Sequence, residues 1–319
     1  MSTPSREQPR NAPVICIVGP TASGKTDVAQ LLARANNGEI VSADSMQIYR
    51  GMDIGTGKLP ENERLVPHYG FDLVDPGQPY SAAVYQTYAR SCFHDISSRG
   101  KLPFLVGGTG LYVRAAIDAY DFPKGEQIDN PEREKWTAFA DEYGAQALWD
   151  RLREVDAESA EVIHPNNVRR VVRAFELLAE GTTYANQKRN LSRIPQAVPA
   201  IFIGLSVNPD ALNTRIEARV DHMVEQGLVE EVKMLLSSGF REGITAPQAI
   251  GYKEIVNAID GRISLSEAID QIKQATRRYA KRQRTWFRKD ARINWVNADS
   301  GDADAIATNA QQFIDRIHG

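Results

Sequence analysis

The residues with the most recognisable chemistry lie near the start of the chain, in a glycine-rich segment that matches the pattern GxxxxGK[ST]. The segment reads Gly19, Pro20, Thr21, Ala22, Ser23, Gly24, Lys25 and Thr26. Its glycines allow consecutive backbone N–H groups to converge on one phosphate, and a helix that follows directs its positive end at the same point. Lys25 would add a mobile positive charge, and Thr26 could hold Mg²⁺. A structural turn is the alternative, but a strand-like segment before it and a helical one after it favour a phosphate site.

The loop alone does not identify the phosphate compound. Kinases, GTPases and ATPases all use loops of this kind. The sequence contains no NKxD motif for reading a guanine base, which disfavours a GTPase. A small-molecule kinase remains open at this point.

Asp44 is a second candidate for chemistry, because it directly follows the strand-like segment 39–43. Ligands of open parallel sheets bind at the carboxyl ends of the strands. By position alone, Asp44 could bind Mg²⁺, act as a general base or cap a turn.

Strand-like and helical patterns alternate around these residues. Short apolar segments predict strands at 14–18, 39–43, 71–74, 103–106 and 199–207. Helical patterns occupy 26–36, 81–98 and 111–120, with Ser81 as the expected N-cap of the second. The alternation predicts an α/β fold with a parallel sheet and helices on both faces, as in P-loop NTPases.

The alternation stops at residues 121–198, where we expect an all-helical insertion. Helical patterns lie at 131–143, 145–154 and 166–180, and Gly181 is typical of a helix end. The insertion would interrupt one α/β core made of residues 13–120 and 199–319. Further helices are expected in the core at 209–226, 228–238, 265–289 and 302–317, with an edge strand at 292–296.

Composition limits the kind of protein. The net charge of -3 argues against a generally basic nucleic-acid binder. Cys16 and Cys92 form no CxxC pair, so we expect both in the core and no zinc site or disulfide. No apolar run approaches the roughly 20 residues of a membrane span. Residues 1–12 are polar, lack the apolar part of a signal peptide and predict a disordered tail, which suggests a cytoplasmic protein.

Positive charge is concentrated in one predicted helix. Eight Lys or Arg and no acidic residue lie between Lys273 and Lys289. One stripe of this helix should pack and contains Ile272, Ala275, Tyr279 and Trp286. Another suits a nucleic-acid backbone and contains Arg277, Lys281, Arg284 and Arg288. A solvated charged face is the alternative, but the excess of one sign favours RNA.

Several strings together resemble the tRNA dimethylallyltransferase family. Besides the glycine-rich loop, they are 44–49 (DSMQIY), 50–58 (RGMDIGTGK), 106–112 (VGGTGLY), 164–166 (HPN), 251–252 (GY) and 280–288 (AKRQRTWFR). The resemblance covers about residues 13–297 and is weakest at 120–160 and at both ends. The chain lacks the zinc-finger tail of larger relatives and is similar to the compact bacterial form, which implies a monomer.

The resemblance implies transfer of a dimethylallyl group from dimethylallyl diphosphate to N6 of adenine 37, in tRNAs that read codons beginning with U. It implies that the loop holds the diphosphate and that Asp44 acts as general base. Lys25, Thr26 and Arg219 would neutralise the leaving diphosphate with Mg²⁺, and Thr109 would be a further contact. Arg219 shares a helix face with Arg215, so without the resemblance a solvated face would be the better interpretation.

The same resemblance implies contacts with the tRNA anticodon stem-loop. The expected residues are Asp44, Ser45, Met46, Gln47, Arg169, Arg170, Arg173, Gln248, Gly251, Tyr252, Lys253, Lys281, Arg282, Arg284 and Arg288. Tyr252 would offer a stacking face, and Met46, Gln47 and Ile48 would line or wedge near an extruded base.

Three other functions remain as alternatives. A small-molecule kinase could use the insertion as a lid, but gives no reason for the basic helix. An RNA-binding protein with a relic loop would not need Lys25, Thr26 and Asp44 together. An adenylate isopentenyltransferase would share the chemistry but accept a free nucleotide. Whether nucleotides also bind the loop stays open.

Overall fold

The computed structural model describes residues 12–122, 130–191 and 194–316. The chain divides into two compact units, one made of Met1–Asp118 and Gln196–Gly319 and the other of Ala119–Pro195. The predicted insertion, 121–198, corresponds to the second unit. The predicted tail at 1–12 lies outside the described residues except for Ala12.

The described part of the first unit contains a sheet of six parallel strands in the order β3-β2-β4-β1-β5-β6. The strands are β1 Val14–Val18, β2 Gly38–Ser42, β3 His68–Tyr69, β4 Leu102–Gly107, β5 Ala200–Ser206 and β6 Ile293–Asn297. In the register, Ile17 of β1 lies opposite Val106 of β4 and Ile203 of β5. The predicted fold class is confirmed, and β6 is the edge strand that the sequence predicted.

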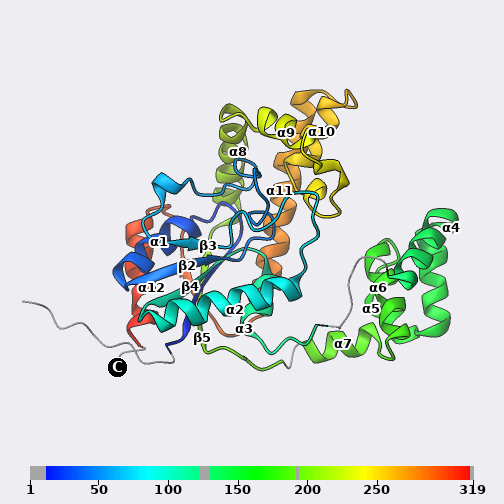
Figure 1. The fold of residues 1–319 in the computed structure, drawn as a ribbon, viewed down its shortest axis with the longest axis horizontal. Coiled ribbons are helices and arrows are strands. Elements are labelled where there is room, and N and C mark those ends of the chain that lie inside the picture. Colours follow the sequence, from blue (N-terminus) through cyan, green and yellow to red (C-terminus); the bar gives the residue numbers. More distant parts are fainter. Residues whose placement is uncertain (1–11, 123–129, 192–193, 317–319) are drawn as a thin grey trace, which may run out of the picture. The chain divides into compact units, whose positions relative to one another are not determined.

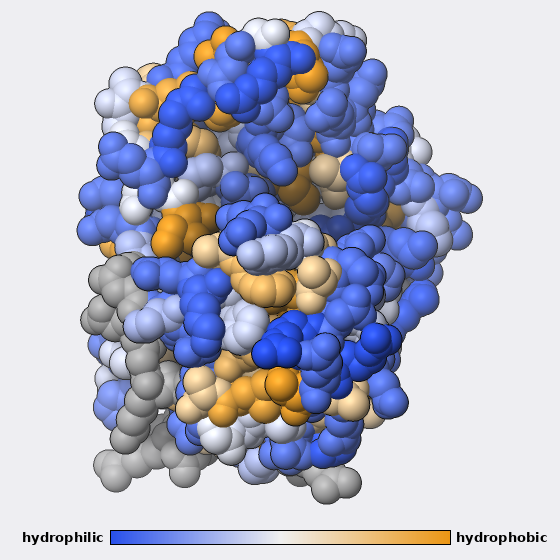
Figure 2. All heavy atoms as spheres, turned by 90° about the vertical axis from the view of Figure 1, so that its right-hand side faces the viewer, coloured by the Kyte–Doolittle hydropathy of each residue, from blue (hydrophilic) through white to orange (hydrophobic). Residues whose placement is uncertain are grey.

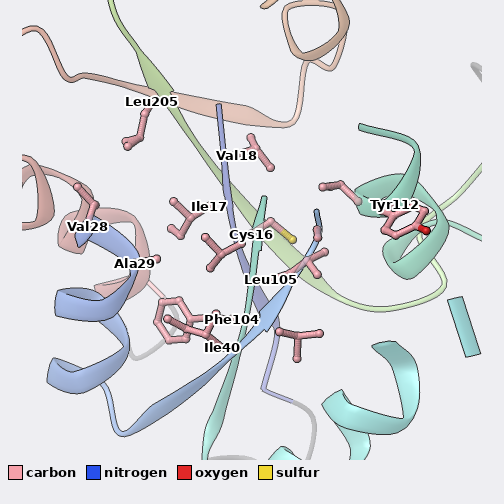
Figure 3. Packing of buried hydrophobic residues seen from close by; sticks show 14 of the residues in the cluster. Cys16, Ile17, Val18, Val28, Ala29, Ile40, Phe104, Leu105, Tyr112 and Leu205 are labelled. Atoms are coloured by element: carbon pink, nitrogen blue, oxygen red, sulfur yellow. The ribbon is translucent and has the colours of Figure 1, made fainter. Parts of the chain in front are cut away.

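Helices cover both faces of this sheet, which is why its inner strands are largely apolar and largely buried. Helices α1 (Lys25–Ala35) and α12 (Ala303–Asp315) pack together on one face, and α2 (Ala82–Ser98) and α3 (Gly110–Ile117) lie on the other (Figure 1). Figure 3 shows Val28 and Ala29 of α1 on one side of the strands and Tyr112 of α3 on the other. The Ser81 hydroxyl accepts a hydrogen bond from Val84 N and so caps α2, as predicted.

A second group of helices in the first unit gathers at one side of the sheet. It consists of α8 (Pro209–Glu225), α9 (Leu228–Leu236), α10 (Tyr252–Ile259) and α11 (Leu265–Phe287), and α11 packs on α8, α10 and α3. The short 3-10 helices Phe240–Glu242 and Ala246–Gln248 connect α9 to α10. Through α11, this group reaches the end of the sheet where the glycine-rich loop lies.

The buried side of α11 differs from the predicted one. Ile272 is buried as expected, but the positions that follow it in the core are Ala280, Gln283 and Phe287. Trp286 packs its indole ring against Gly110 but is 42% exposed, so the prediction that it packs is confirmed only in part. The neighbouring residue, Phe287, is the one whose side chain is buried in the core at this end of the helix.

The second unit is helical throughout its described residues. It contains α4 (Pro131–Val155), α5 (Ala157–Val162), α6 (Val168–Ala179) and α7 (Tyr184–Leu191). Gly144, at φ 87°, interrupts α4 between the two stretches that the sequence predicted. The ring of Trp136 stacks on Phe175 at 3.7 Å within a separate small core. The expected helical insertion therefore has its own hydrophobic interior.

The two ends of this insertion meet. Asp118 and Gln196 form an isolated antiparallel bridge, and Ala119 N donates to Pro195 O at 2.9 Å. The Asp118 side chain is fully buried and forms ion pairs with Arg114 at 2.7 Å and with Arg292 at 2.6 Å. The point where the chain leaves and re-enters the core is therefore fixed.

Some element predictions were wrong. Residues 71–74 do not form the third strand, because Asp72 adopts φ 54° and turns the chain there. The strand is the shorter His68–Tyr69, and Val74 makes only a single bridge with Tyr49. Three short helices were missed, namely α5, α7 and α10.

The face of the molecule drawn in Figure 2 is largely hydrophilic. On the face shown in Figure 2, hydrophobic side chains are confined to small separate areas. None of the described helices combines the length and the apolarity that crossing a membrane requires.

Candidate active site

The glycine-rich loop connects the carboxyl end of β1 to the first turn of α1. Ala22 and Gly24 both have left-handed backbone conformations, at φ 61° and 80°. Alternation of this kind turns successive N–H groups toward one point. Gly24 is the N-cap of α1 and offers no side-chain cap, so the first N–H groups of the helix are left for a ligand. The loop is built to hold an anion.

The Ser23 hydroxyl supports that interpretation. Its Oγ is buried and has no hydrogen-bond partner among the residues that the structure describes. Buried polar atoms are rarely left unsatisfied in native structures, and exceptions mark sites for a ligand, ion or water. A phosphate oxygen in the loop would provide the missing partner.

Two cations and one carboxylate surround the loop. Burial and the nearby charge of Arg219 lower the pKa of Lys25 to about 8, and the Asp44 carboxylate opposes this. Burial also lowers the pKa of Arg219, whereas Asp44 and Asp27 raise it. Lys25 Nζ donates to the Pro20 carbonyl at 3.2 Å. Lys25, Arg219 and Asp44 therefore lie close enough for their charges to interact, and two adjacent, partly buried cations favour an anion between them.

Asp44 lies where β2 ends, two residues after Ser42, and its position is fixed by short-range contacts. Its Oδ1 accepts a hydrogen bond from Met46 N at 2.9 Å. The next residue is tied to the end of β4, because Ser45 N donates to Thr109 Oγ1 at 3.1 Å. Since β4 lies between β2 and β1 in the sheet, these contacts bring Asp44 and Thr109 to the same edge as the loop.

Helix α11 contributes two residues that the sequence analysis did not assign to the site. Gln283 Oε1 accepts from Thr21 N at 2.8 Å, and its Nε2 donates to Gly108 O at 3.0 Å. The second residue is Tyr279, whose pKa is raised to about 12. Burial and the charge of Asp44 raise this pKa, and hydrogen bonds to Thr109 and Gln283 partly oppose them, so Tyr279 lies next to these site residues. The available signal was Gln283 itself, a neutral polar residue on the apolar face of a basic helix.

The segment after Asp44 is only partly available for an RNA base. Gln47 is held within the protein, since its Oε1 accepts from Ser42 Oγ at 2.7 Å and its Nε2 donates to Gly57 O at 3.3 Å. Met46 is half-buried. Ile48 is fully buried in the core, so the prediction that it lines or wedges near a base is wrong.

Around α10, the predicted RNA contacts separate into buried and exposed residues. Gln248 and Lys253 are exposed. Gly251 is buried at φ 96°, and its N–H donates to Glu254 Oε2. Tyr252 is fully buried and its hydroxyl donates to Glu231 at 2.6 Å, so the predicted stacking face is wrong.

The basic stripe of α11 lines a groove of about 450 Å³ against the first turn of α8. The basic residues in its lining are Arg277, Arg278, Lys281, Arg284 and Arg288. Arg277 forms an ion pair with Glu217 at 2.6 Å, whereas Lys281 and Arg288 are exposed. Arg282 is exposed outside this lining. The groove therefore carries positive charge that a phosphate backbone would complement.

The arginines predicted to contact RNA in the second unit differ in their surroundings. Arg169 and Arg170, in the first turn of α6, are exposed. Arg173 is half-buried and forms ion pairs with Glu176 at 2.6 Å and Glu180 at 3.2 Å. Much of the charge of Arg173 is thus neutralised within the unit.

No cluster of three or more His, Cys, Asp or Glu side chains suited to a metal ion occurs in the described parts of the chain. Cys16 is buried in β1, and burial raises the pKa of its thiol. Cys92 is half-buried. Both cysteines are free, as predicted.

Comparison with known proteins agrees with these features. The family model described as IPP transferase matches residues 47–290, and one described as Isopentenyl transferase matches residues 12–66. The tRNA dimethylallyltransferase of Halalkalibacterium halodurans is 46% identical over 304 residues, which cover 94% of this chain and 96% of the relative. That of Carboxydothermus hydrogenoformans is 47% identical over 297 residues, or 92% and 94% of the two chains.

Solved structures show the same fold. The tRNA isopentenylpyrophosphate transferase of Bacillus halodurans superposes with a TM-score of 0.70 at 44% identity, over 96% of this chain and 97% of the other. A eukaryotic dimethylallyltransferase acting on tRNA gives a TM-score of 0.78 at 28% identity, over 96% and 80%.

Proposed function

The chain belongs to the IPP transferase family and is a tRNA-prenylating transferase, and from this premise we propose that it transfers a dimethylallyl group from dimethylallyl diphosphate to N6 of adenine 37. The acceptors are tRNAs that read codons beginning with U. The observation that carries the proposal is the glycine-rich loop, whose N–H groups are uncapped and whose buried Ser23 hydroxyl has no partner in the described structure, with the charges of Lys25, Arg219 and Asp44 beside it.

The first requirement of this reaction is to stabilise the departing diphosphate. An allylic C–O bond breaks readily because the carbon can carry positive charge, but negative charge then accumulates on the leaving group. The first N–H groups of α1 are left uncapped beside the loop, and the positive charges of Lys25 and Arg219 lie next to each other there before the reaction begins. Such preorganisation is the most effective electrostatic contribution to catalysis, because no dipoles need to reorient during the step.

The second requirement is to direct the adenine amine and accept its proton. A bond forms between N6 and the allylic carbon as the carbon–oxygen bond to diphosphate breaks, and the extra proton on nitrogen passes to the Asp44 carboxylate. A carboxylate within hydrogen-bond reach can do this late in the step. Thr109, linked to Ser45, would hold the leaving oxygen or a diphosphate oxygen.

Mg²⁺ fits this site without a cluster of carboxylates. The ion keeps several waters and is usually bound by substrate phosphates with one or two carboxylates, and in glycine-rich phosphate loops the Ser or Thr hydroxyl also binds it. Thr26, at the second position of α1, supplies a hydroxyl of the required type beside the loop. When bound with the diphosphate, the ion would neutralise part of its negative charge.

For the tRNA, we propose that the groove on α11 contacts the phosphate backbone, together with Arg282 and the exposed Gln248, Lys253, Arg169 and Arg170. Phosphate contacts position a nucleic acid and leave base edges to decide the sequence. The target adenine must leave the stack of its loop to reach Asp44. We also propose that the protein acts in the cytoplasm, where its tRNA substrates are, and that it acts as a monomer.

A transfer assay tests the proposal. Purified protein, Mg²⁺ and radiolabelled dimethylallyl diphosphate are incubated with unmodified tRNA, AMP or ATP as acceptors. We expect label only in the tRNA and at adenine 37 after nuclease digestion. Label in AMP or ATP would show a nucleotide-modifying enzyme, and hydrolysis of ATP without transfer would show a kinase or ATPase.

A further inference from the structure

Residues 52–58 form a compact turn whose two sides face different neighbours. Internal hydrogen bonds close the turn, from Gly57 N to Ile54 O at 3.0 Å and from Lys58 N to Asp53 O at 2.9 Å. Lys58 Nζ is buried and donates to Asp53 Oδ1 at 2.5 Å and to Asp72 Oδ1 at 2.6 Å. The reaction proposed above gives this turn no role, although it contains the whole string DIGTGK.

One side of the turn is held by a buried carboxylate. Glu231 of α9 is only 5% exposed, and it accepts hydrogen bonds from three consecutive backbone N–H groups. Its Oε2 accepts from Asp53 N at 3.1 Å and Ile54 N at 2.7 Å, and its Oε1 accepts from Gly55 N at 3.2 Å. Tyr252 OH donates to the same Oε1 at 2.6 Å. Hydrogen bonds to an ionised acceptor are about twice as strong as neutral ones, so the turn is firmly attached.

The other side of the turn faces the active site. The Thr56 carbonyl accepts a hydrogen bond from Arg219 Nη2 at 3.2 Å and from Gln47 Nε2 at 3.4 Å. The same Gln47 lies three residues after Asp44. The turn therefore connects Glu231 to Arg219, the cation that would neutralise the diphosphate.

The two glycines of the turn make these approaches possible. A Cβ atom at Gly55 would lie 2.5 Å from the ring of Tyr252, and one at Gly57 would lie 2.2 Å from Arg219 Nη2. Gly57 also has φ 60°, which disfavours other residues. The sequence of the turn is thus explained by the need to admit Tyr252 on one side and Arg219 on the other.

We propose that Glu231, supported by Tyr252, is a positioning residue that acts through the turn 52–58 to hold the Arg219 guanidinium against the diphosphate. The proposal rests on the function proposed above, in which Arg219 contacts the leaving group. Glu231 touches no reacting atom itself. Without its carboxylate, the Thr56 carbonyl is no longer fixed and Arg219 loses its orienting acceptor.

The test measures binding of inorganic diphosphate by titration calorimetry to the whole protein and to five variants. The variants are Glu231→Gln, Tyr252→Phe, Arg219→Gln, the double variant Glu231→Gln with Arg219→Gln, and Glu230→Gln. Glu230 is the matched control, since it is exposed on the same helix and contacts only Lys233 at 3.4 Å in the described structure. Affinity for unmodified tRNA is measured beside each.

We expect Arg219→Gln to weaken diphosphate binding about 10- to 100-fold, the loss of one charge-assisted hydrogen bond, and Glu231→Gln about 10-fold. Tyr252→Phe should weaken it about threefold, because the carboxylate keeps its three backbone donors. Glu230→Gln should bind as the unaltered protein does, and tRNA affinity should stay unchanged throughout. In the Arg219→Gln background, Glu231→Gln should have almost no further effect, because the residue through which it acts is gone.

Other results overturn the inference. The inference is wrong if Glu231→Gln binds diphosphate as the unaltered protein does. It is also wrong if Glu231→Gln lowers the affinity for diphosphate equally in the presence and absence of Arg219, because that result indicates a purely structural role. If Glu231→Gln does not fold, a sixth variant, Tyr252→Phe with Arg219→Gln, is compared with Tyr252→Phe and with Arg219→Gln and decides in the same way. Failure of the unaltered protein to bind diphosphate would instead show that the proposed function is wrong, and the inference would fall with it.

Discussion

The low pKa of Lys25 predicts that substrate binding depends on pH in a range where lysines normally remain charged. Lys25 titrates near pH 8 in the ligand-free protein, because burial and Arg219 both disfavour its ammonium form. An ordinary lysine titrates near 10.4. A diphosphate in the loop favours the ammonium, so its binding raises the pKa of Lys25 again. Affinity that depends on this charge is therefore fully present below about pH 8 and decreases as the pH rises.

The magnitude follows from the fraction of protein that carries the charge. About nine-tenths of Lys25 is protonated at about pH 7 and about one-tenth at about pH 9. If only the ammonium form binds well, the Kd of dimethylallyl diphosphate should rise about 10-fold between these pH values. The ligand itself does not account for this change, because a phosphate group whose second pKa is about 6 is already mostly ionised at about pH 7 and any further ionisation would strengthen binding.

Calorimetric titration of dimethylallyl diphosphate without tRNA, at a series of pH values, measures this dependence. Lys25→Arg is the matched control, since a guanidinium stays charged over the whole range. Its affinity is expected to be lower but independent of pH. A flat profile for the unaltered protein, or a slope that persists in Lys25→Arg, would refute the assignment of the dependence to Lys25.

Three further predictions concern the carboxylate, the buried amide and the groove. Asp44→Asn should reduce turnover by about 10²- to 10⁴-fold and leave tRNA affinity within a few-fold, and near-normal turnover would exclude a general base. Gln283→Leu should lower the free energy of unfolding in urea by about 2–5 kcal/mol, because the N–H of Thr21 and the Gly108 carbonyl lose a buried partner; unchanged stability would contradict this. Replacing Lys281 and Arg288 by Ala should reduce the salt dependence of tRNA binding by about 1.5 units of log–log slope, and an unaltered slope would separate the groove from RNA.

The parts of the fold that depend on local patterns were predictable. Continuous apolar strands ending in glycine or aspartate gave the sheet and placed the glycine-rich loop and Asp44 at its edge. The break in alternation located the helical insertion. Local rules failed where one residue overrides its neighbours, as Asp72 does with its left-handed conformation after an apolar segment.

The parts of the site that depend on distant partners were not predictable. Gln283 meets Thr21 across 262 positions, and Glu231 meets Gly55 across 176. Residues so far apart in the sequence show no spacing pattern from which their contact could be predicted. Tyr252 shows the limit most clearly, since its aromatic character suggested a surface for stacking and its actual partner is a buried carboxylate. The family motif singled out Tyr252, but only the structure shows that its hydroxyl contacts Glu231.

The meeting of the insertion's two ends has a consequence for how the protein can change. The bridge between Asp118 and Gln196 joins the two points where the chain leaves and re-enters the first unit. For the stability of that unit, residues 119–195 therefore act as a single closed loop. The entropy of closing a loop grows only logarithmically, by about 0.6 kcal/mol for each doubling of its length. Lengthening, trimming or exchanging the inserted helices should therefore barely alter the stability of the catalytic sheet. The inserted helices can therefore diversify while the sheet that carries the glycine-rich loop stays constant.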